Sequence, residues 1–90
     1  MNTIKVLGIE YNIVYKNNSE MNGLIGFADF NKQLICINSE HTEQTKEIAV
    51  YHEIIHIISE AHGLNLSEEQ VKIGTHALIA YLKENERKVY

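Results

Sequence analysis

The chain has 90 residues, of which 44% are hydrophobic and none is proline, a composition typical of a folded globule and not of a disordered segment. A chain of this length predicts one domain spanning residues 1–90, with a small core. The formal net charge is −4, and no basic cluster occurs before the last few residues, so nucleic acid is not an expected partner.

Cysteine content and hydropathy indicate the cellular compartment in which the protein is expected. Cys36 is the only cysteine, so no internal disulfide can form, and zinc sites built from several thiolates are excluded. The N-terminal segment MNTIKVLGIEYNIVYK lacks the apolar core of about 7–15 residues found in signal peptides, and no run approaches the roughly 18 apolar residues of a membrane span. We therefore expect a soluble, cytoplasmic protein with no membrane partner.

The first half of the chain has the pattern of strands. Apolar residues at every second position from Ile9 to Tyr15 predict a strand with one face on a core. After the polar loop KNNSEMNG, the segments LIGFADF and LICIN, separated by NKQ, predict a hairpin. Together these strands predict the small N-terminal antiparallel sheet of an α+β fold.

The second half predicts two helices. Ser39 or Thr42 can cap a first helix that starts near Glu43, and Gly63 is suited to end it.

The start of the second helix is marked more clearly. Ser67 and Gln70 fit a capping box, which predicts that this helix begins at Glu68. One sector of it should face the first helix, and that sector contains Val71, Thr75, Leu78 and Leu82.

The stretch VYHEIIHII contains two histidines and a glutamate within an apolar run. On a helical wheel with about 100° per residue, His52 and His56 lie about 40° apart on one face, outside the apolar arc. Both imidazoles can therefore reach one Zn²⁺, as in the HExxH motif. Glu53 is turned to the side, where it can accept a proton from an activated water without ligating the metal. The pattern predicts amide hydrolysis, and the alternative is a chance spacing on an ordinary amphipathic helix.

A catalytic zinc site normally has three protein ligands and a water, so a third ligand is needed. His62 completes the metzincin spacing, except that Ser59 replaces the glycine at which that chain turns. If the helix continues to Gly63, His62 falls about 120° from His56, on the core side, and cannot reach the metal. No methionine follows Met21, so the chain has no Met-turn.

Glu68 and Glu69 are the other candidates for the third ligand, although the helix dipole favours acidic residues at a helix start in any case. Glu68 shares the inward sector, whereas Glu69 points to the opposite side with Ile73 and His76. An inward carboxylate is costly unless it is paired or coordinated. Glu68 is therefore the expected third ligand, with Glu69 and His62 as alternatives.

The segment VYHEIIHIISEAHGLNLSEEQVKIGTHALIAYL resembles the core of the ImmA/IrrE-type zinc metallopeptidases of bacteria, their phages and mobile elements, which are gluzincin-like zincins. The preceding GFADFNKQLICIN is similar to the small phage-encoded members. Glu68 precedes Val71 by three positions, as a glutamate does in that family, whereas Lys72 replaces the family's usual Asn. The resemblance implies a minimal zincin-like fold, a zinc cofactor, and an intracellular protein substrate such as a repressor in a bacterial host cell.

Two questions stay open at the level of sequence. Zinc peptidases usually need a donor for the developing oxyanion, and the sequence does not select among Tyr51, His41 and His76. A zincin-fold protein that captures an extended peptide without cutting it is an alternative function. A small structural or regulatory protein, in which HEIIH is coincidental, is another.

Overall fold

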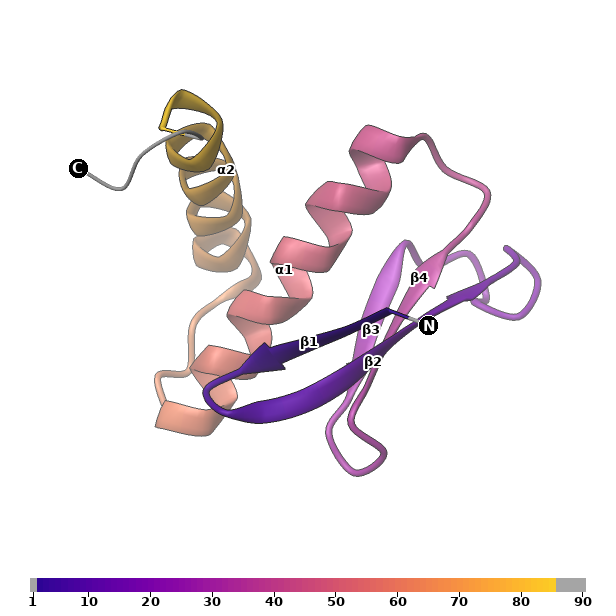
Figure 1. The fold of residues 1–90 in the computed structure, drawn as a ribbon, viewed down its shortest axis with the longest axis horizontal. Coiled ribbons are helices and arrows are strands. Elements are labelled where there is room, and N and C mark those ends of the chain that lie inside the picture. Colours follow the sequence, from indigo (N-terminus) through magenta and orange to yellow (C-terminus); the bar gives the residue numbers. More distant parts are fainter. Residues whose placement is uncertain (1, 86–90) are drawn as a thin grey trace.

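A four-stranded sheet is followed by two helices (Figure 1). The computed structural model describes residues 2–85. Its elements are β1 (Asn2–Val6), β2 (Ile9–Lys16), β3 (Gly26–Asp29), β4 (Leu34–Asn38), α1 (Glu43–His62) and α2 (Glu68–Glu84). The α+β layout expected from the sequence, with strands before two helices, is confirmed.

The sheet is mixed, with strand order β1-β2-β4-β3, and not antiparallel throughout as the sequence suggested. The β1–β2 and β3–β4 pairs are antiparallel, whereas β2 and β4 are parallel, with Ile13 opposite Ile35. The reason is that β4, the most apolar strand, takes a central position where Ile35, Cys36 and Ile37 are all buried. The hairpin partner β3 is left at the edge of the sheet.

The strand β1 was not predicted, and it pairs with β2 through a two-residue turn at Leu7 and Gly8. Both turn residues have positive φ, 54° and 82°, as a type I′ hairpin turn requires. Gly8 adopts such a conformation without steric cost, whereas a leucine rarely does.

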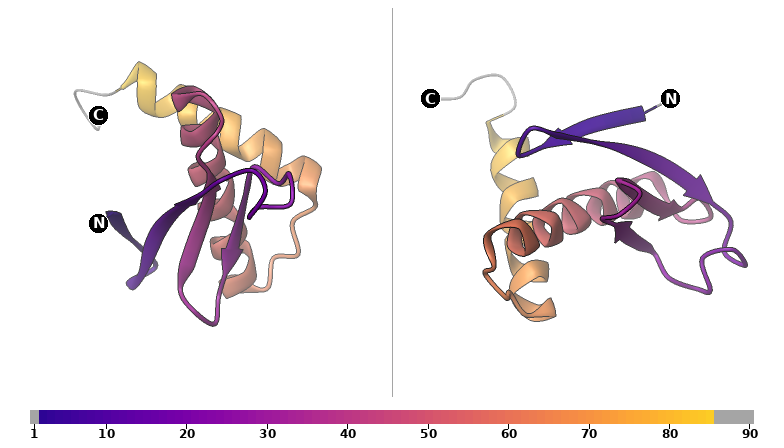
Figure 2. Two further views of the ribbon diagram at one scale, coloured as in Figure 1. Left: turned by 90° about the vertical axis from the view of Figure 1, so that its right-hand side faces the viewer. Right: turned by 90° about the horizontal axis from the view of Figure 1, so that it is seen from below.

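The helix α1 lies across one face of the sheet, and α2 packs on the side of α1 away from the strands (Figure 2). The buried cluster between α1 and the sheet contains Val6, Tyr11, Ile35, Ile37, Ala49 and Ile57. Ala49 is buried because α1 approaches β3 closely there. A Cβ on Gly26 would lie 3.5 Å from the Cβ of Ala49.

Both helices begin at the predicted residues, and α1 ends at the predicted one, because local backbone and capping interactions fix these ends. The cap of α1 is Thr42 and not Ser39, since the Thr42 hydroxyl accepts a hydrogen bond from a backbone N–H three residues later. Gly63 ends α1 in the left-handed conformation, with φ 63°. Ser67 and Gln70 form both hydrogen bonds of the capping box at the start of α2.

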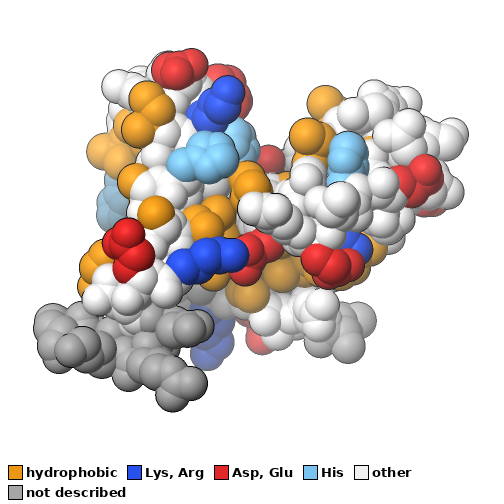
Figure 3. Space-filling model, turned by 90° about the horizontal axis from the view of Figure 1, so that it is seen from above, with side chains coloured by type: hydrophobic (Ala, Val, Ile, Leu, Met, Phe, Trp, Pro, Cys, Tyr) orange, Lys and Arg blue, Asp and Glu red, His pale blue; other side chains and the backbone are white. Residues whose placement is uncertain are grey.

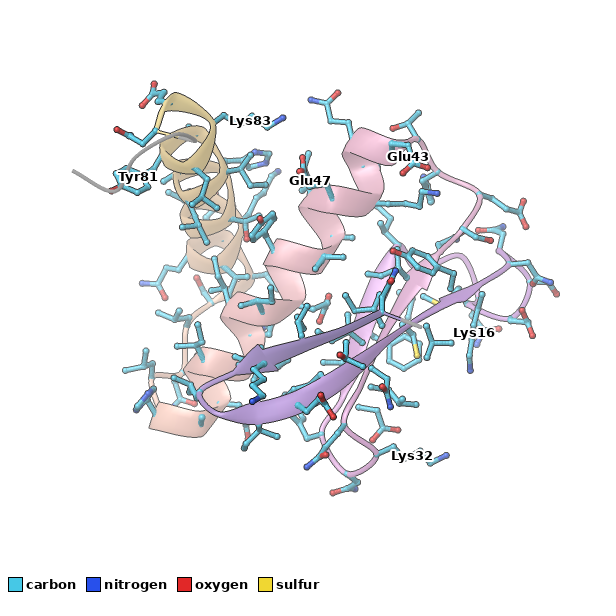
Figure 4. The ribbon with its side chains drawn as sticks, viewed as in Figure 1. Lys16, Lys32, Glu43, Glu47, Tyr81 and Lys83 are labelled. Atoms are coloured by element: carbon cyan, nitrogen blue, oxygen red, sulfur yellow. The ribbon has the colours of Figure 1, made fainter. Side chains whose placement is uncertain are left out.

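Charged side chains are mixed on the surface. Acidic and basic groups are interspersed over the face that Figure 3 presents. Glu47 of α1 and Lys83 of α2 point toward one another (Figure 4), with 3.6 Å between Oε1 and Nζ. None of the helices in the described part of the chain is long and apolar enough to cross a bilayer.

Candidate metal centre

Three side chains from the two helices converge at one point. The Nε2 atoms of His52 and His56, one turn apart on α1, lie 3.2 Å from each other. Glu68, at the first turn of α2, brings Oε1 within 3.3 Å of His52 Nε2 and Oε2 within 3.1 Å of His56 Nε2. Each residue offers one ligand atom, all within 4.8 Å of one another, so the group could hold a metal ion.

The spacing of the two imidazole nitrogens fits a tetrahedral metal. Zinc bound by nitrogen or oxygen at about 2.0–2.1 Å places neighbouring ligand atoms about 3.3 Å apart at the tetrahedral angle, and the two Nε2 atoms lie 3.2 Å apart. The histidines contact different oxygens of Glu68, His52 with Oε1 and His56 with Oε2. Two imidazoles and one carboxylate also leave a fourth position for water or substrate, as catalytic zinc sites do.

Hydrogen bonds alone do not satisfy all three contacts. Each neutral imidazole Nε2 carries at most one proton, and an ionised carboxylate has none to donate. If both Nε2–H groups donate to Glu68, the protons of His52 and His56 oppose one another at an N–N distance of 3.2 Å. If one histidine donates to the other, the Nε2 atom that accepts carries no proton. That nitrogen then has no hydrogen to donate to the Glu68 carboxylate. A metal cation bound between the two imidazoles and the carboxylate would accept lone pairs from all three side chains, so none of them would need a proton between them.

The cluster lies at the margin of the core. The side chains of both histidines are 27% exposed, and that of Glu68 is 77% exposed. Glu68 points toward the histidines as predicted, but it lies on the rim of the site and not on a buried apolar face. Desolvation of Glu68 is therefore small, and the carboxylate is oriented by its contacts with the histidines.

The inward face of α2 is the predicted one in the first turns of the helix, whereas Leu78 is only half-buried and Leu82, also predicted to face inward, is exposed because it lies in the last turn. Val71 and Thr75 are buried, and the Thr75 hydroxyl donates a 2.7 Å hydrogen bond to the Val71 carbonyl oxygen. Glu69, Ile73 and His76 are exposed on the other side. Glu69 therefore does not belong to the metal-binding group.

A hydrogen-bonded turn after α1 brings Glu68 back over the histidines. The buried Ser59 accepts two hydrogen bonds from this turn, one at its carbonyl from the Leu64 N–H and one at its hydroxyl from the Leu66 N–H. The bonds measure 2.9 Å and 3.1 Å. The serine that replaces the metzincin glycine thus has its own role, because it holds the chain reversal that precedes α2.

His62 does not join this group, as expected, but the predicted reason is wrong. The wheel put His62 on the core side, whereas it is exposed in the last turn of α1. Ala61 beside it is exposed too, because the end of α1 extends past the packed part of the core.

Glu53 lies beside this group of three residues without belonging to it. It is buried, with 8% of its surface exposed. Burial raises the pKa of the Glu53 carboxyl above its ordinary value, and this is opposed by His56 and His52 and reinforced by Glu68. A carboxyl group with a raised pKa is better matched to proton transfer near neutral pH than an exposed one.

Two hollows meet at Glu53. The first, of about 380 Å³, lies on the His52 side and is bordered by the segment from Gly23 to Gly26. The second, of about 230 Å³, lies on the His56 side and is bordered by Ala28. Thr45 borders the first hollow and Asn65 the second. The sequence did not single out either residue, because their positions depend on packing between distant segments.

None of the three oxyanion-donor candidates borders these hollows. Tyr51, His41 and His76 are absent from the walls of both. The structure therefore selects none of them as the donor.

The edge strand β3 runs past both hollows. The Asn38 N–H donates to the Ile25 carbonyl oxygen at 2.8 Å, so alternate residues from Ile25 onward bond to β4. The backbone groups of Gly26 and Ala28 consequently face away from β4, toward the open edge. These two small residues border the hollows on either side of Glu53.

A buried asparagine holds the wall of the first hollow. The Asn38 amide donates to Asn18 Oδ1 at 2.8 Å and to the Leu24 carbonyl oxygen at 3.0 Å. Its Oδ1 accepts from the Glu40 N–H at 2.9 Å. Asn38 is fully buried, so this network fixes the loop that carries Leu24 beside the metal centre.

Comparison with protein-family models, curated proteins and solved structures finds no match for this chain. The function must therefore be inferred from the chain's own residues.

Proposed function

We propose that the protein is a zinc-dependent metallopeptidase that hydrolyses a peptide bond in an intracellular protein. The observation that carries the proposal is the convergence of His52, His56 and Glu68 beside a buried glutamate that is not a ligand. Two histidines and a glutamate form one of the ligand sets of catalytic zinc. When bound, zinc supplies a Lewis acid that lowers the pKa of a coordinated water toward about 7.

Glu53 is the general base in this proposal. Its raised pKa and its position between the two hollows suit a carboxylate that takes a proton from the attacking water. The same group can return that proton to the leaving amine, so it acts in both halves of the reaction.

The edge of β3 supports a polypeptide as the substrate. The outward-facing N–H and C=O groups of Gly26 and Ala28 can pair with an extended chain, as in recognition by strand addition. A side chain at Gly26 would be tightly packed, because a Cβ there would lie 3.2 Å from Ile37 Cδ1 and 3.3 Å from the Cys36 carbonyl oxygen. A chain paired at this edge would cross the hollows on both sides of Glu53.

A second candidate is a zincin-fold protein that binds a peptide without cutting it. The free edge of β3 favours this function too, since strand addition needs no metal. The resemblance to ImmA/IrrE-type metallopeptidases favours the peptidase, with a regulator such as a repressor as its target.

Metal analysis and three substitutions test the proposal. The purified protein should contain one equivalent of zinc, and His52→Ala should lose it. Glu53→Gln should keep the zinc and abolish hydrolysis, measured by mass spectrometry of new N-termini in a bacterial extract. Glu47→Gln, the same change elsewhere on α1, is the matched control and should cleave normally. Loss of zinc in Glu53→Gln would make Glu53 a ligand, and identical new N-termini with this variant would leave only the binding function.

A further inference from the structure

A third hollow lies at the end of the sheet, where it is bordered by residues of the β1–β2 turn, the β3–β4 turn and the end of α1. Its volume is about 480 Å³. We call it the distal hollow, and its lining includes Leu7, Ile9, Tyr11, Phe30, Ile57 and Glu60. The candidate metal centre does not use it directly.

Apolar side chains remain at the surface around the distal hollow. Leu7 is 53% exposed, and Ile9 and Phe30 are each 44% exposed. Single exposed apolar residues are common, but three around one hollow form a patch of the kind that marks a binding surface.

Leu7 is held in an unfavourable conformation at this rim. Its φ of 54° lies in the left-handed region, where a leucine is disfavoured and Asn-Gly is the preferred pair for a type I′ turn. The exposed side chain offers little core packing in return. A leucine that lowers the stability of its own turn while extending an apolar surface is better explained by binding than by folding.

The distal hollow adjoins the proposed substrate cleft. Phe30 and Glu60 border both the distal hollow and the hollow that contains Glu53 and His56. Phe30 directly follows β3, so a chain that pairs with the edge of β3 and continues past its end arrives at the distal hollow.

We propose that the distal hollow binds a large apolar side chain of the polypeptide substrate. A chain lying antiparallel to β3, the more stable pairing, runs from the Phe30 end toward Gly26. At about 3.3 Å per residue, the bound side chain then belongs about three to five residues to the N-terminal side of the cleaved bond. This inference rests on the proposed peptidase function and adds a specificity site to it.

Peptidyl hydroxamates test the inference by binding alone. The hydroxamate chelates the metal of the zinc-loaded full chain and so fixes the register of the peptide. The probes are acetyl-pentaalanine hydroxamate and five variants in which leucine replaces one alanine at each position, with affinities measured by calorimetry. Leucine at one of the third to fifth residues from the hydroxamate should tighten binding about tenfold, the gain expected from burying an aliphatic side chain.

Substitutions in the chain complete the test. Leu7→Asn and Phe30→Ala should abolish the tenfold gain. Leu7 borders neither hollow at Glu53, so Leu7→Asn should also leave the affinity of the pentaalanine probe unchanged. Leu7→Asn should also raise the unfolding temperature, because asparagine suits the turn, so the loss cannot be attributed to misfolding. Ile73→Ala, which removes a 60% exposed side chain of α2, is the control and should keep the gain.

The outcomes separate the two proposals. A flat leucine scan with a pentaalanine probe that still binds would overturn the distal site while leaving the metal centre intact. Retention of the gain in both Leu7→Asn and Phe30→Ala would overturn it as well. A wild-type dimer that Leu7→Asn converts to a monomer would assign the hollow to self-association instead. Failure of every hydroxamate to bind the zinc-loaded chain would count against the metallopeptidase function itself.

Discussion

Glu68 and Glu69 are adjacent acidic residues in the first turn of a helix, where the helix dipole favours both. Only Glu68 has contacts that the dipole does not explain, at 3.3 Å from His52 and 3.1 Å from His56. Glu69 is exposed on the other side of α2. At the scale of single residues, these contacts distinguish a candidate metal ligand from a residue that only favours the helix start.

Substitution of the three candidates for the third ligand should rank them clearly. Glu68→Ala should weaken zinc binding by more than about 100-fold, since loss of even an outer-shell partner costs about 10–100-fold. Glu69→Ala and His62→Ala should leave the affinity within about twofold, because neither side chain belongs to the cluster. Competition against a chromophoric chelator measures all three. The reverse ranking would move the protein to another zincin subclass.

Cys36 allows a test of pH dependence away from the metal centre. Burial raises the pKa of its thiol above the ordinary value of 9.0. The charges of Lys16 and Lys32 lower this pKa, and the charge of Asp29 raises it. A group with a raised pKa in the folded state stabilises the fold below its unfolded pKa. That contribution is lost as pH rises through the folded pKa.

The free energy of unfolding should therefore fall more steeply above pH 9.0 in the wild type than in Cys36→Val. Urea titrations from pH 7 to pH 10.5 measure the difference. The native thiol should also react with Ellman's reagent at least about 100-fold more slowly than the thiol of the unfolded chain. A native rate equal to the unfolded rate would show that the thiol is accessible.

At the scale of elements, the site depends on how α2 returns along α1. Described residues of α2 pack on α1 and on no strand, so the position of Glu68 depends on the inward face of α2 and on the turn that precedes it. Val71 and Thr75 supply the buried part of that face. Ser59 supplies the hydrogen bonds of the turn.

Ser59→Ala should affect both stability and metal binding. Loss of the hydroxyl leaves the Leu66 N–H without its acceptor, which costs about 1–2 kcal/mol of unfolding free energy. Zinc affinity should fall about tenfold, because Leu66 lies two residues before Glu68. Chemical denaturation and chelator competition measure the two effects.

Ser39→Ala is the matched control, because it removes an exposed hydroxyl that donates to the Lys16 carbonyl oxygen far from α2. It should leave zinc affinity unchanged. An unchanged affinity in Ser59→Ala, despite reduced stability, would mean that the packing of Val71 alone sets the position of Glu68.

At the scale of the whole molecule, the short chain forms three layers, which are the sheet, α1 and α2. The sheet, α1 and α2 are stacked, so the hollows at Glu53 lie between α1 and the edge of the sheet with no further domain over them in the described chain (Figure 2). A ligand pocket that buries most of a small molecule needs more wall than this. Affinity should come instead from backbone pairing and from contacts spread along the cleft.

The zinc-loaded protein should therefore hydrolyse generic short peptides poorly. We expect kcat/KM for such peptides to be at least about 100-fold below kcat/KM for a locally unfolded segment of the protein target. The reason is that a short peptide cannot make most of the contacts that an extended chain makes along the cleft. Fluorogenic peptides of mixed sequence measure the first value. Rapid, sequence-tolerant cleavage of these peptides by the isolated protein would contradict the expectation.

The sequence alone determined the features that depend on neighbours in the chain. Both ends of α1 and the start of α2 follow from Thr42, Gly63 and the Ser67–Gln70 capping box, because each cap is a hydrogen bond or a dihedral angle within a few residues. The pairing of His52 with His56 follows from one turn of one helix. The periodicity of α2 also indicated that Glu68, not Glu69, turns toward α1.

Only the tertiary structure decided the features that depend on distant segments. The central position of β4, the burial of Glu53 and the outward backbone of Gly26 and Ala28 come from contacts between segments far apart in sequence. The same holds for the distal hollow, where Leu7 meets Phe30. Hydrophobic alternation predicts which face of a strand is buried, but it does not specify which strand becomes its neighbour, because pairing is chosen by the burial of the whole core.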